Sequence, residues 1–183
     1  MSEPATTLLS GWHDVFVILA TGSATFIGAM FIVVSIGGRF LTPEKLTESG
    51  LFLTPSLVHL TVVLLGCALG AAPLAGATVV AACFGVIGVG GLGYALCVAF
   101  QTRTRKLEWI DHICYGFAPI GGYALIAAAS GLAAARASIS ATVLTAGFAA
   151  LLGVSIRNVW DLMVFFVARA EQPPPGESPP DQG

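Results

Sequence analysis

Two opposite charges stand inside the last apolar stretch of the sequence. Arg157 and Asp161 lie four residues apart in ISIRNVWDLMVFF, so a helix would place them on one face, one turn apart. An arginine at the centre of a bilayer costs about 2.5–3.5 kcal/mol even on the most lenient insertion scale, and an ion pair lowers that cost. Asn158 adds hydrogen-bonding groups beside them. Two interpretations stay open: a polar centre for an ion, proton or ligand, or a buried ion pair that orients this helix.

His59 is the third titratable side chain inside an apolar run. A neutral imidazole can accept a hydrogen bond from Arg157 or donate one to Asp161, and a histidine titrating against an aspartate can relay protons. The alternative is a packing histidine whose ring nitrogens find partners on a neighbouring helix. We therefore predict a polar intramembrane centre formed by His59, Arg157, Asn158 and Asp161.

The sequence predicts no metal site, no cofactor and no enzymatic activity. No two histidines have the i, i+4 spacing of a helical metal site, and the four cysteines form no Cys-x-x-Cys pair. The motifs of serine hydrolases and zinc proteases are absent. The stretch from Gly88 to Gly93 reads G-x-G-x-x-G, but it lies within an apolar run rather than after a strand, so we interpret its glycines as packing residues.

The elements that must position these residues are transmembrane helices. Hydrophobic residues make up 56% of the 183 residues and charged residues only 10%, against about 25% in a soluble domain. This composition excludes secreted disulfide scaffolds, nucleic-acid-binding proteins and a large enzyme domain outside the bilayer. A spanning helix needs about 20 apolar residues. Five runs qualify and predict an all-α, polytopic bundle: 15–38, 55–72, 77–100, 112–135 and 139–168.

Prolines and threonines suggest where the second of these spans begins. Thr54 can cap a helix whose first turn contains Pro55. The preceding polar segment, 41–50, predicts a separate short surface helix beginning at Pro43.

Positively charged residues in the loops predict the orientation, because cytoplasmic loops are rich in Lys and Arg. Six of them fall on one side of the predicted bundle, and only Arg136 falls on the other. The six are Arg39, Lys45, Arg103, Arg105, Lys106 and Arg169. Residues 1–14 are therefore predicted to be external, and the Pro-rich tail 170–183 is predicted to be cytoplasmic and disordered.

Small residues predict the contacts between the helices, because lipid provides no hydrophobic drive and close approach decides packing. The candidates are Ala24 and Gly28 in the first span, Gly66 and Gly70 in the second, and Gly153 in the fifth. One face of the fifth span is expected to join a central interface; it contains Thr142, Ala146, Ala150, Gly153, Arg157 and Asp161. Pro119 predicts a kink in the fourth span.

Two stretches resemble a known group of proteins. GSATFIGAMFIVVSIGGRF in the first span and IRNVWDLMVFF in the last are similar to small five-span bacterial inner-membrane proteins without an assigned function. The resemblance implies a multi-pass protein of a bacterial inner membrane and a stand-alone helical domain. It implies no catalytic residues.

These patterns favour a role in binding. Short loops and the lack of a catalytic constellation predict an accessory, scaffold or regulatory subunit that acts by helix–helix binding. The partners would be the lipid bilayer and another membrane protein or a second copy, with no nucleic acid. The alternative is a small transporter or channel around His59, Arg157 and Asp161, although these polar residues occupy only one half of the membrane.

Overall fold

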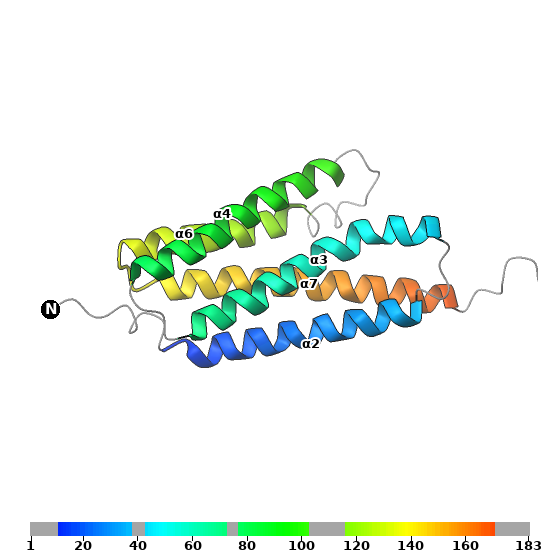
Figure 1. The fold of residues 1–183 in the computed structure, drawn as a ribbon, viewed down its shortest axis with the longest axis horizontal. Coiled ribbons are helices and arrows are strands. Elements are labelled where there is room, and N and C mark those ends of the chain that lie inside the picture. The colour runs from blue at the N-terminus through cyan, green and yellow to red at the C-terminus, as the bar shows by residue number, and fades with distance from the viewer. Residues whose placement is uncertain (1–10, 38–42, 73–76, 103–115, 171–183) are drawn as a thin grey trace, which may run out of the picture.

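The computed structural model describes residues 11–37, 43–72, 77–102 and 116–170. These residues form five α-helices and no strand, which confirms the all-helical prediction. The helices lie along one another in an elongated bundle (Figure 1). They are α2 (His13–Gly37), α3 (Pro43–Ala71), α4 (Ala77–Thr102), α6 (Ala118–Ala134) and α7 (Ser140–Ala170).

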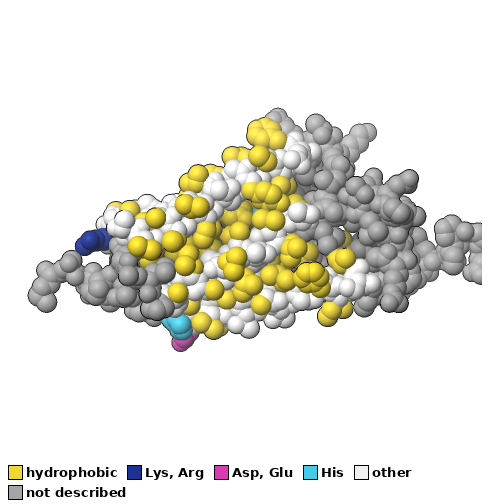
Figure 2. All heavy atoms as spheres, in the orientation of Figure 1, with side chains coloured by type: hydrophobic (Ala, Val, Ile, Leu, Met, Phe, Trp, Pro, Cys, Tyr) yellow, Lys and Arg dark blue, Asp and Glu magenta, His cyan; other side chains and the backbone are white. Residues whose placement is uncertain are grey.

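Four of the described helices, α2, α3, α4 and α7, contain an apolar segment long enough to cross a membrane. The fifth, α6, has 17 residues and is about 25 Å long, against a hydrocarbon core of about 30 Å. Large apolar side chains point outward, among them Val86 at 75% and Ile18 at 69% exposure. Figure 2 shows apolar side chains across the visible face, with the charged ones at one end. The chain is a multi-pass membrane protein.

Two prolines stand in places that the sequence analysis did not predict. Helix α3 begins at Pro43, as predicted for the surface helix, but it continues without interruption through Pro55 into the membrane segment. Pro55 therefore lies in a helix interior, where it cannot donate the usual hydrogen bond, a loss that membrane helices tolerate. Pro119 lies in the first turn of α6. At this position its missing N–H breaks no hydrogen bond of α6. Residues 116–117 immediately before α6 form a π-helical turn, and residues 103–115 lie outside the described residues, so the kink at Pro119 stays a prediction.

Helix α7 lies at the centre of the packing. It contacts α6 on one side and both α3 and α2 on the other, while α2 pairs with α3 and α4 pairs with α6. Helices α3 and α4 follow each other in the sequence yet touch only slightly. The bundle is therefore two helix pairs joined mainly by α7 (Figure 1).

Glycines set the distances inside these pairs. On α4, a Cβ at Gly88 would lie 2.5 Å from the backbone nitrogen of Ala127, and Gly91 lies against the ring of Tyr123. Of the three G-x-G-x-x-G glycines, only Gly88 thus belongs to the contact between α4 and α6. A Cβ at Gly90 or Gly93 would meet nothing within 4 Å, so the prediction that these two are packing residues is wrong within this chain. Between α6 and α7, a Cβ at Gly147 would lie 2.9 Å from the carbonyl oxygen of Gly122.

The GxxxG pair of α3 packs against aromatic rings rather than against another backbone. A Cβ at Gly66 would lie 2.5 Å from Cζ of Phe148, and a Cβ at Gly70 would lie 3.1 Å from Cδ2 of Phe16. Both phenylalanines are fully buried. Phe148 also meets Phe84 of α4 edge to face, with ring centroids 6.0 Å apart. These two glycines therefore provide room for the largest side chains of the core.

The helix ends alternate between the two ends of the bundle (Figure 1). The start of α2 meets the end of α3 at one end, where Nδ1 of His13 lies 3.2 Å from the carbonyl oxygen of Ala71. The turn at Arg136 is at the same end. Lys45 and Arg169 lie in helical turns at the opposite end. The other four residues of the basic set, the N-terminal residues 1–10 and the tail 171–183 lie outside the described residues. The side of the membrane that each end faces stays a prediction.

Candidate functional site

The four residues predicted to form one polar centre lie in three different surroundings. His59 is on α3 and only 2% exposed. Its Nδ1 shares a 2.8 Å hydrogen bond with the hydroxyl of Tyr123 on α6. Its ring also meets Tyr94 of α4 edge to face, with centroids 6.0 Å apart. His59 is thus a buried histidine whose described partners are tyrosines.

This histidine–tyrosine cluster, formed by His59, Tyr94 and Tyr123, connects the two helix pairs. Tyr123 is fully buried, and its ring occupies the space that the missing side chain of Gly91 leaves. Because α3 and α4 touch only slightly, the hydrogen bond from α3 to α6 is a direct polar link between the pairs. Among the described residues, no group of three His, Cys, Asp or Glu side chains could hold a metal ion. The geometry favours a structural role for His59.

Tyr94 and Tyr123 were not among the residues predicted to form the polar centre. The sequence does contain a hint of this partnership. A histidine in an apolar span needs a hydrogen-bonding partner, and the chain contains only three tyrosines that could provide a phenol hydroxyl. What could not be read from the sequence was which helix faces His59.

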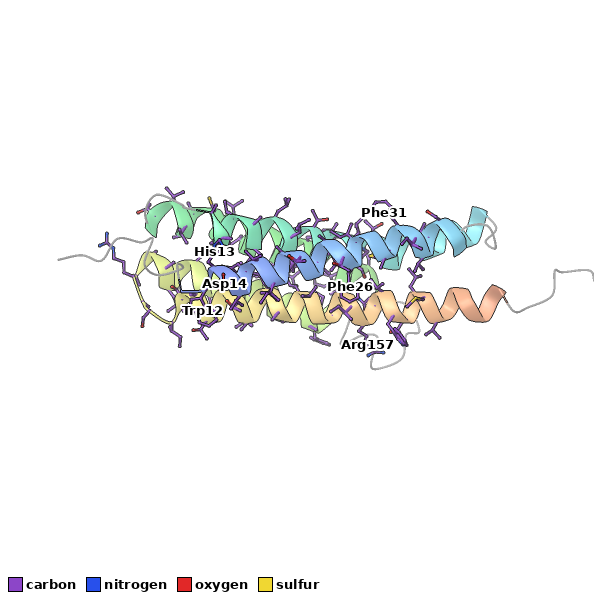
Figure 3. All side chains as sticks on the ribbon, turned by 90° about the horizontal axis from the view of Figure 1, so that it is seen from below. Trp12, His13, Asp14, Phe26, Phe31 and Arg157 are labelled. Atoms are coloured by element: carbon purple, nitrogen blue, oxygen red, sulfur yellow. The ribbon has the colours of Figure 1, made fainter. Side chains whose placement is uncertain are left out.

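Arg157 and Asp161 form the predicted ion pair. Nη2 of Arg157 lies 3.3 Å from Oδ2 of Asp161, and the two side chains are 41% and 42% exposed. Both residues lie within the apolar segment Ser140–Val164 of α7. At 1.5 Å per residue, Arg157 is about 10 Å from the C-terminal end of this segment. Figure 3 shows Arg157 pointing away from the other helices. The pair is therefore on the outward face of α7 and not in the core.

Asn158 lies on the inward side of α7, about 100° around the helix from Arg157. It is 4% exposed, and its Oδ1 has no hydrogen-bond partner among the residues that the structure describes. Ser155, one turn earlier, is fully buried and donates to the carbonyl oxygen of Leu151 at 2.8 Å. Asn158 thus shares neither the surroundings of the ion pair nor the described contacts of His59.

The small residues of α7 that were predicted to join a central interface lie on the outward face instead. Thr142, Ala146 and Gly153 are exposed, and no atom lies within 4 Å of a Cβ built at Gly153. Ala150 is partly exposed. The inward face carries Leu144, Phe148 and Leu151 instead. Toward α6 the inward face also contains Gly147, which lies against Gly122, whereas Phe148 fills the space beside Gly66 of α3. The central contact of α7 is therefore made by a different set of residues from the predicted one.

The small residues predicted to form a helix contact in the first span also lie on an outward face, that of α2. Ala24 and Gly28 on α2 are exposed, and a Cβ at Gly28 would meet no atom within 4 Å. Within this chain, α2 packs instead through residues such as Phe16, Ser23 and Met30.

Comparisons with models of protein families, with curated proteins and with solved structures gave no match. The resemblance to small five-span bacterial inner-membrane proteins therefore stays a prediction.

Proposed function

We propose that this protein acts by binding another transmembrane helix, as an accessory, scaffold or regulatory subunit of a bacterial inner membrane. One observation carries the proposal: the Arg157–Asp161 ion pair is about two-fifths exposed within an apolar, membrane-length segment. The exposed side of α7 that carries this pair is the binding face.

The cost of charge in lipid supports this assignment. A charged side chain that faces hydrocarbon costs several kcal/mol unless it reaches water or a protein partner. Small residues on the same face, such as Ala146 and Gly153, permit close approach of another helix, and such residues are enriched at contacts between membrane helices. A helix seated here would remove the ion pair from lipid and would gain packing contacts along the small residues.

The alternative is a small transporter, which needs polar groups along one route across the membrane. His59 contacts Tyr94 and Tyr123 inside the bundle, whereas Arg157 and Asp161 lie on the outward face of α7. This separation supports binding over conduction.

Affinity purification of the tagged full-length protein from its native membrane tests the proposal. We expect a membrane partner to co-purify with the wild type, to be lost with Gly153→Leu and to be retained with Gly90→Leu. Gly90 is the matched control because it too has open space around its missing side chain. Solute flux in proteoliposomes, together with unchanged co-purification in Gly153→Leu, would contradict binding through α7 and favour the transporter.

A further inference from the structure

We infer that the helix bound by the outward face of α7 is α7 of a second copy of this chain, so that the protein forms a twofold-symmetric dimer. The inference rests on the proposed function and names the partner of the same face. Its contact surface, here called the α7 seam, consists of Thr142, Ala146, Ala149, Gly153, Arg157 and Trp160.

The α7 seam has the period of paired helices. Thr142 and Ala149 are seven residues apart, as are Ala146, Gly153 and Trp160. A seven-residue repeat keeps one stripe facing a partner helix when two helices cross at about 20°. All of these residues are exposed in the single chain, Trp160 at 61%. The repeat belongs to two parallel helices rather than to contacts inside this bundle.

The two ends of the seam differ in kind. At Thr142, Ala146, Ala149 and Gly153 the side chains are small, so two copies of α7 can approach closely. At Arg157 and Trp160 they are large. A contact between two copies must therefore place each large side chain where the other copy leaves room or offers a favourable partner.

Twofold symmetry provides that partner. At 100° per residue, Arg157 lies about 40° to one side of Gly153 and Trp160 about 20° to the other side. A twofold axis along the membrane normal brings the Arg157 side of one seam against the Trp160 side of the other seam. The guanidinium of Arg157 then faces the indole of the second copy's Trp160, and the same contact occurs twice. Arginine over tryptophan is a favourable cation–π pair, and Asp161 can remain bonded to its own Arg157. This self-complementarity is the reason to choose a second copy over an unrelated helix.

Disulfide trapping in native membranes tests the dimer. In a chain whose four cysteines are replaced by alanine, single cysteines are introduced at Gly153, at Gly90 and at Gly28, and the membranes are oxidised. Gly90 is the matched control because it lies thirteen residues after Ala77, the start of α4, as Gly153 lies thirteen residues after Ser140, the start of α7. All three glycines have open space around a Cβ. We expect covalent dimers of the Gly153→Cys chain and none of the other two.

The contact between Arg157 and Trp160 has a separate test. In reconstituted full-length protein, energy transfer between labelled copies gives the dimer association constant. Trp160→Leu should lower it about tenfold, and Trp160→Phe, which keeps an aromatic face, should lower it less. Gly153→Leu should abolish the dimer without unfolding the monomer, since its side chain enters open space.

Several outcomes would overturn the inference. Cross-linking at Gly28 alone would place the interface on α2, and no cross-linking with a purely monomeric reconstituted protein would exclude the dimer. An unchanged association constant in Trp160→Leu would reject the Arg157 contact and with it the argument for a second copy. If the protein is monomeric and a different protein still co-purifies in a way that Gly153→Leu abolishes, the inference fails and the proposed function survives. If neither a second copy nor a different protein binds through the α7 seam, the inference and the proposed function both fail.

Discussion

Several hydroxyl groups in this apolar bundle form hydrogen bonds in one of two ways. Thr21 and Thr61 donate back to carbonyl oxygens one turn earlier on their own helices, at 2.8 Å in both cases. Ser23 donates across to the carbonyl oxygen of Leu60 at 2.6 Å, and Ser130 reaches Ala81 at 2.7 Å. Cross-helix bonds of the second kind fix the register between neighbours, and the bond between His59 and Tyr123 is of this kind.

Tyr123→Phe should lower the stability of the protein in detergent by about 1 kcal/mol, because it leaves a buried ring nitrogen of His59 without its partner. Tyr94→Phe is the control: it keeps the edge-to-face contact with His59 and should cost much less. Reversible unfolding in mixed micelles measures both. Equal losses in the two variants would show that ring packing, and not the hydroxyl, makes the link.

Asp161→Asn should lower stability by about 0.5–1 kcal/mol, the range of exposed ion pairs and of hydrogen bonds between membrane helices. The reason is that Arg157 stays charged at any accessible pH and loses the ion pair with Asp161. Arg157→Leu combined with Asp161→Leu should restore or exceed wild-type stability of the monomer. Unfolding titrations in detergent compare the three chains.

The same double variant also separates the two interpretations of the ion pair. If stability returns but binding through α7 does not, the pair serves binding. If both return, it is a structural pair. An unchanged stability of Asp161→Asn would mean that the pair contributes nothing to the folded chain.

At the scale of the helix, glycines have two different roles that sequence spacing does not distinguish. Gly88 and Gly91 on α4 are covered by α6, whereas a Cβ at Gly90 or Gly93 would meet nothing within 4 Å. The four lie in one short stretch, and only their angular position on the helix separates them.

Gly88→Ala should therefore destabilise the protein by about 1–3 kcal/mol, because its Cβ would lie 2.5 Å from the backbone nitrogen of Ala127 and the two helices would have to separate. Gly90→Ala should be neutral or stabilising by up to about 1 kcal/mol, since alanine is the better helix former. Thermal unfolding in detergent measures the difference. A loss in Gly90→Ala as large as that in Gly88→Ala would contradict the packing of α4 on α6.

The turn between α6 and α7 contains a strained residue. Arg136 has a φ of 56°, a left-handed conformation that costs a residue with a side chain about 1–2 kcal/mol. Its N–H donates to the carbonyl oxygen of Ala133 at 3.0 Å, and that of Ala137 donates to Leu132 at 2.9 Å. These two hydrogen bonds are those of a Schellman motif, a helix end in which glycine is the preferred residue at the left-handed position.

Arg136→Gly should consequently be more stable than Arg136→Ala by about 1 kcal/mol, because glycine adopts this conformation at no steric cost. Both variants remove the same charge, so their difference isolates the backbone conformation. Melting temperatures of the two purified variants provide the measurement. Identical values would show that the turn relaxes to another conformation.

In the whole molecule, the helix ends alternate between the two ends of the bundle, and these two ends are the parts expected to meet water. One end contains the turn at Arg136 and the contact between His13 and Ala71. The opposite end contains the ends of α4 and α7 and the starts of α3 and α6. The six-to-one distribution of basic residues predicts that this second end is cytoplasmic.

A single cysteine at Ala137 should accordingly be labelled by a membrane-impermeant reagent in intact cells, and one at Thr104 should be labelled only after the cells are opened. The physical reason is that positive loops are retained on the cytoplasmic side. Gel shifts after maleimide labelling report both sites. The reverse labelling pattern would show that the chain has the opposite orientation in the membrane.

The sequence by itself determined the helical membrane class, the approximate positions of the helices and the pairing of Arg157 with Asp161. These features depend on composition, on the length of apolar runs and on a spacing within one helix, all of which are local. The continuation of α3 from Pro43 through Pro55 and the place of Pro119 in the first turn of α6 were not predicted. Whether a proline begins a helix or lies inside one depends on the segments that precede and follow it.

Only the tertiary structure decided which face of each helix points inward. The rotation of α7 about its own axis puts Asn158 in the core and Gly153 outside, although both lie in one span. In a membrane this rotation leaves little trace in the sequence, because the core and the lipid are both apolar and hydrophobic residues suit either. The partnership of His59 with Tyr123 likewise follows from how α3 and α6 meet around α7, a property of the whole bundle and not of any one segment.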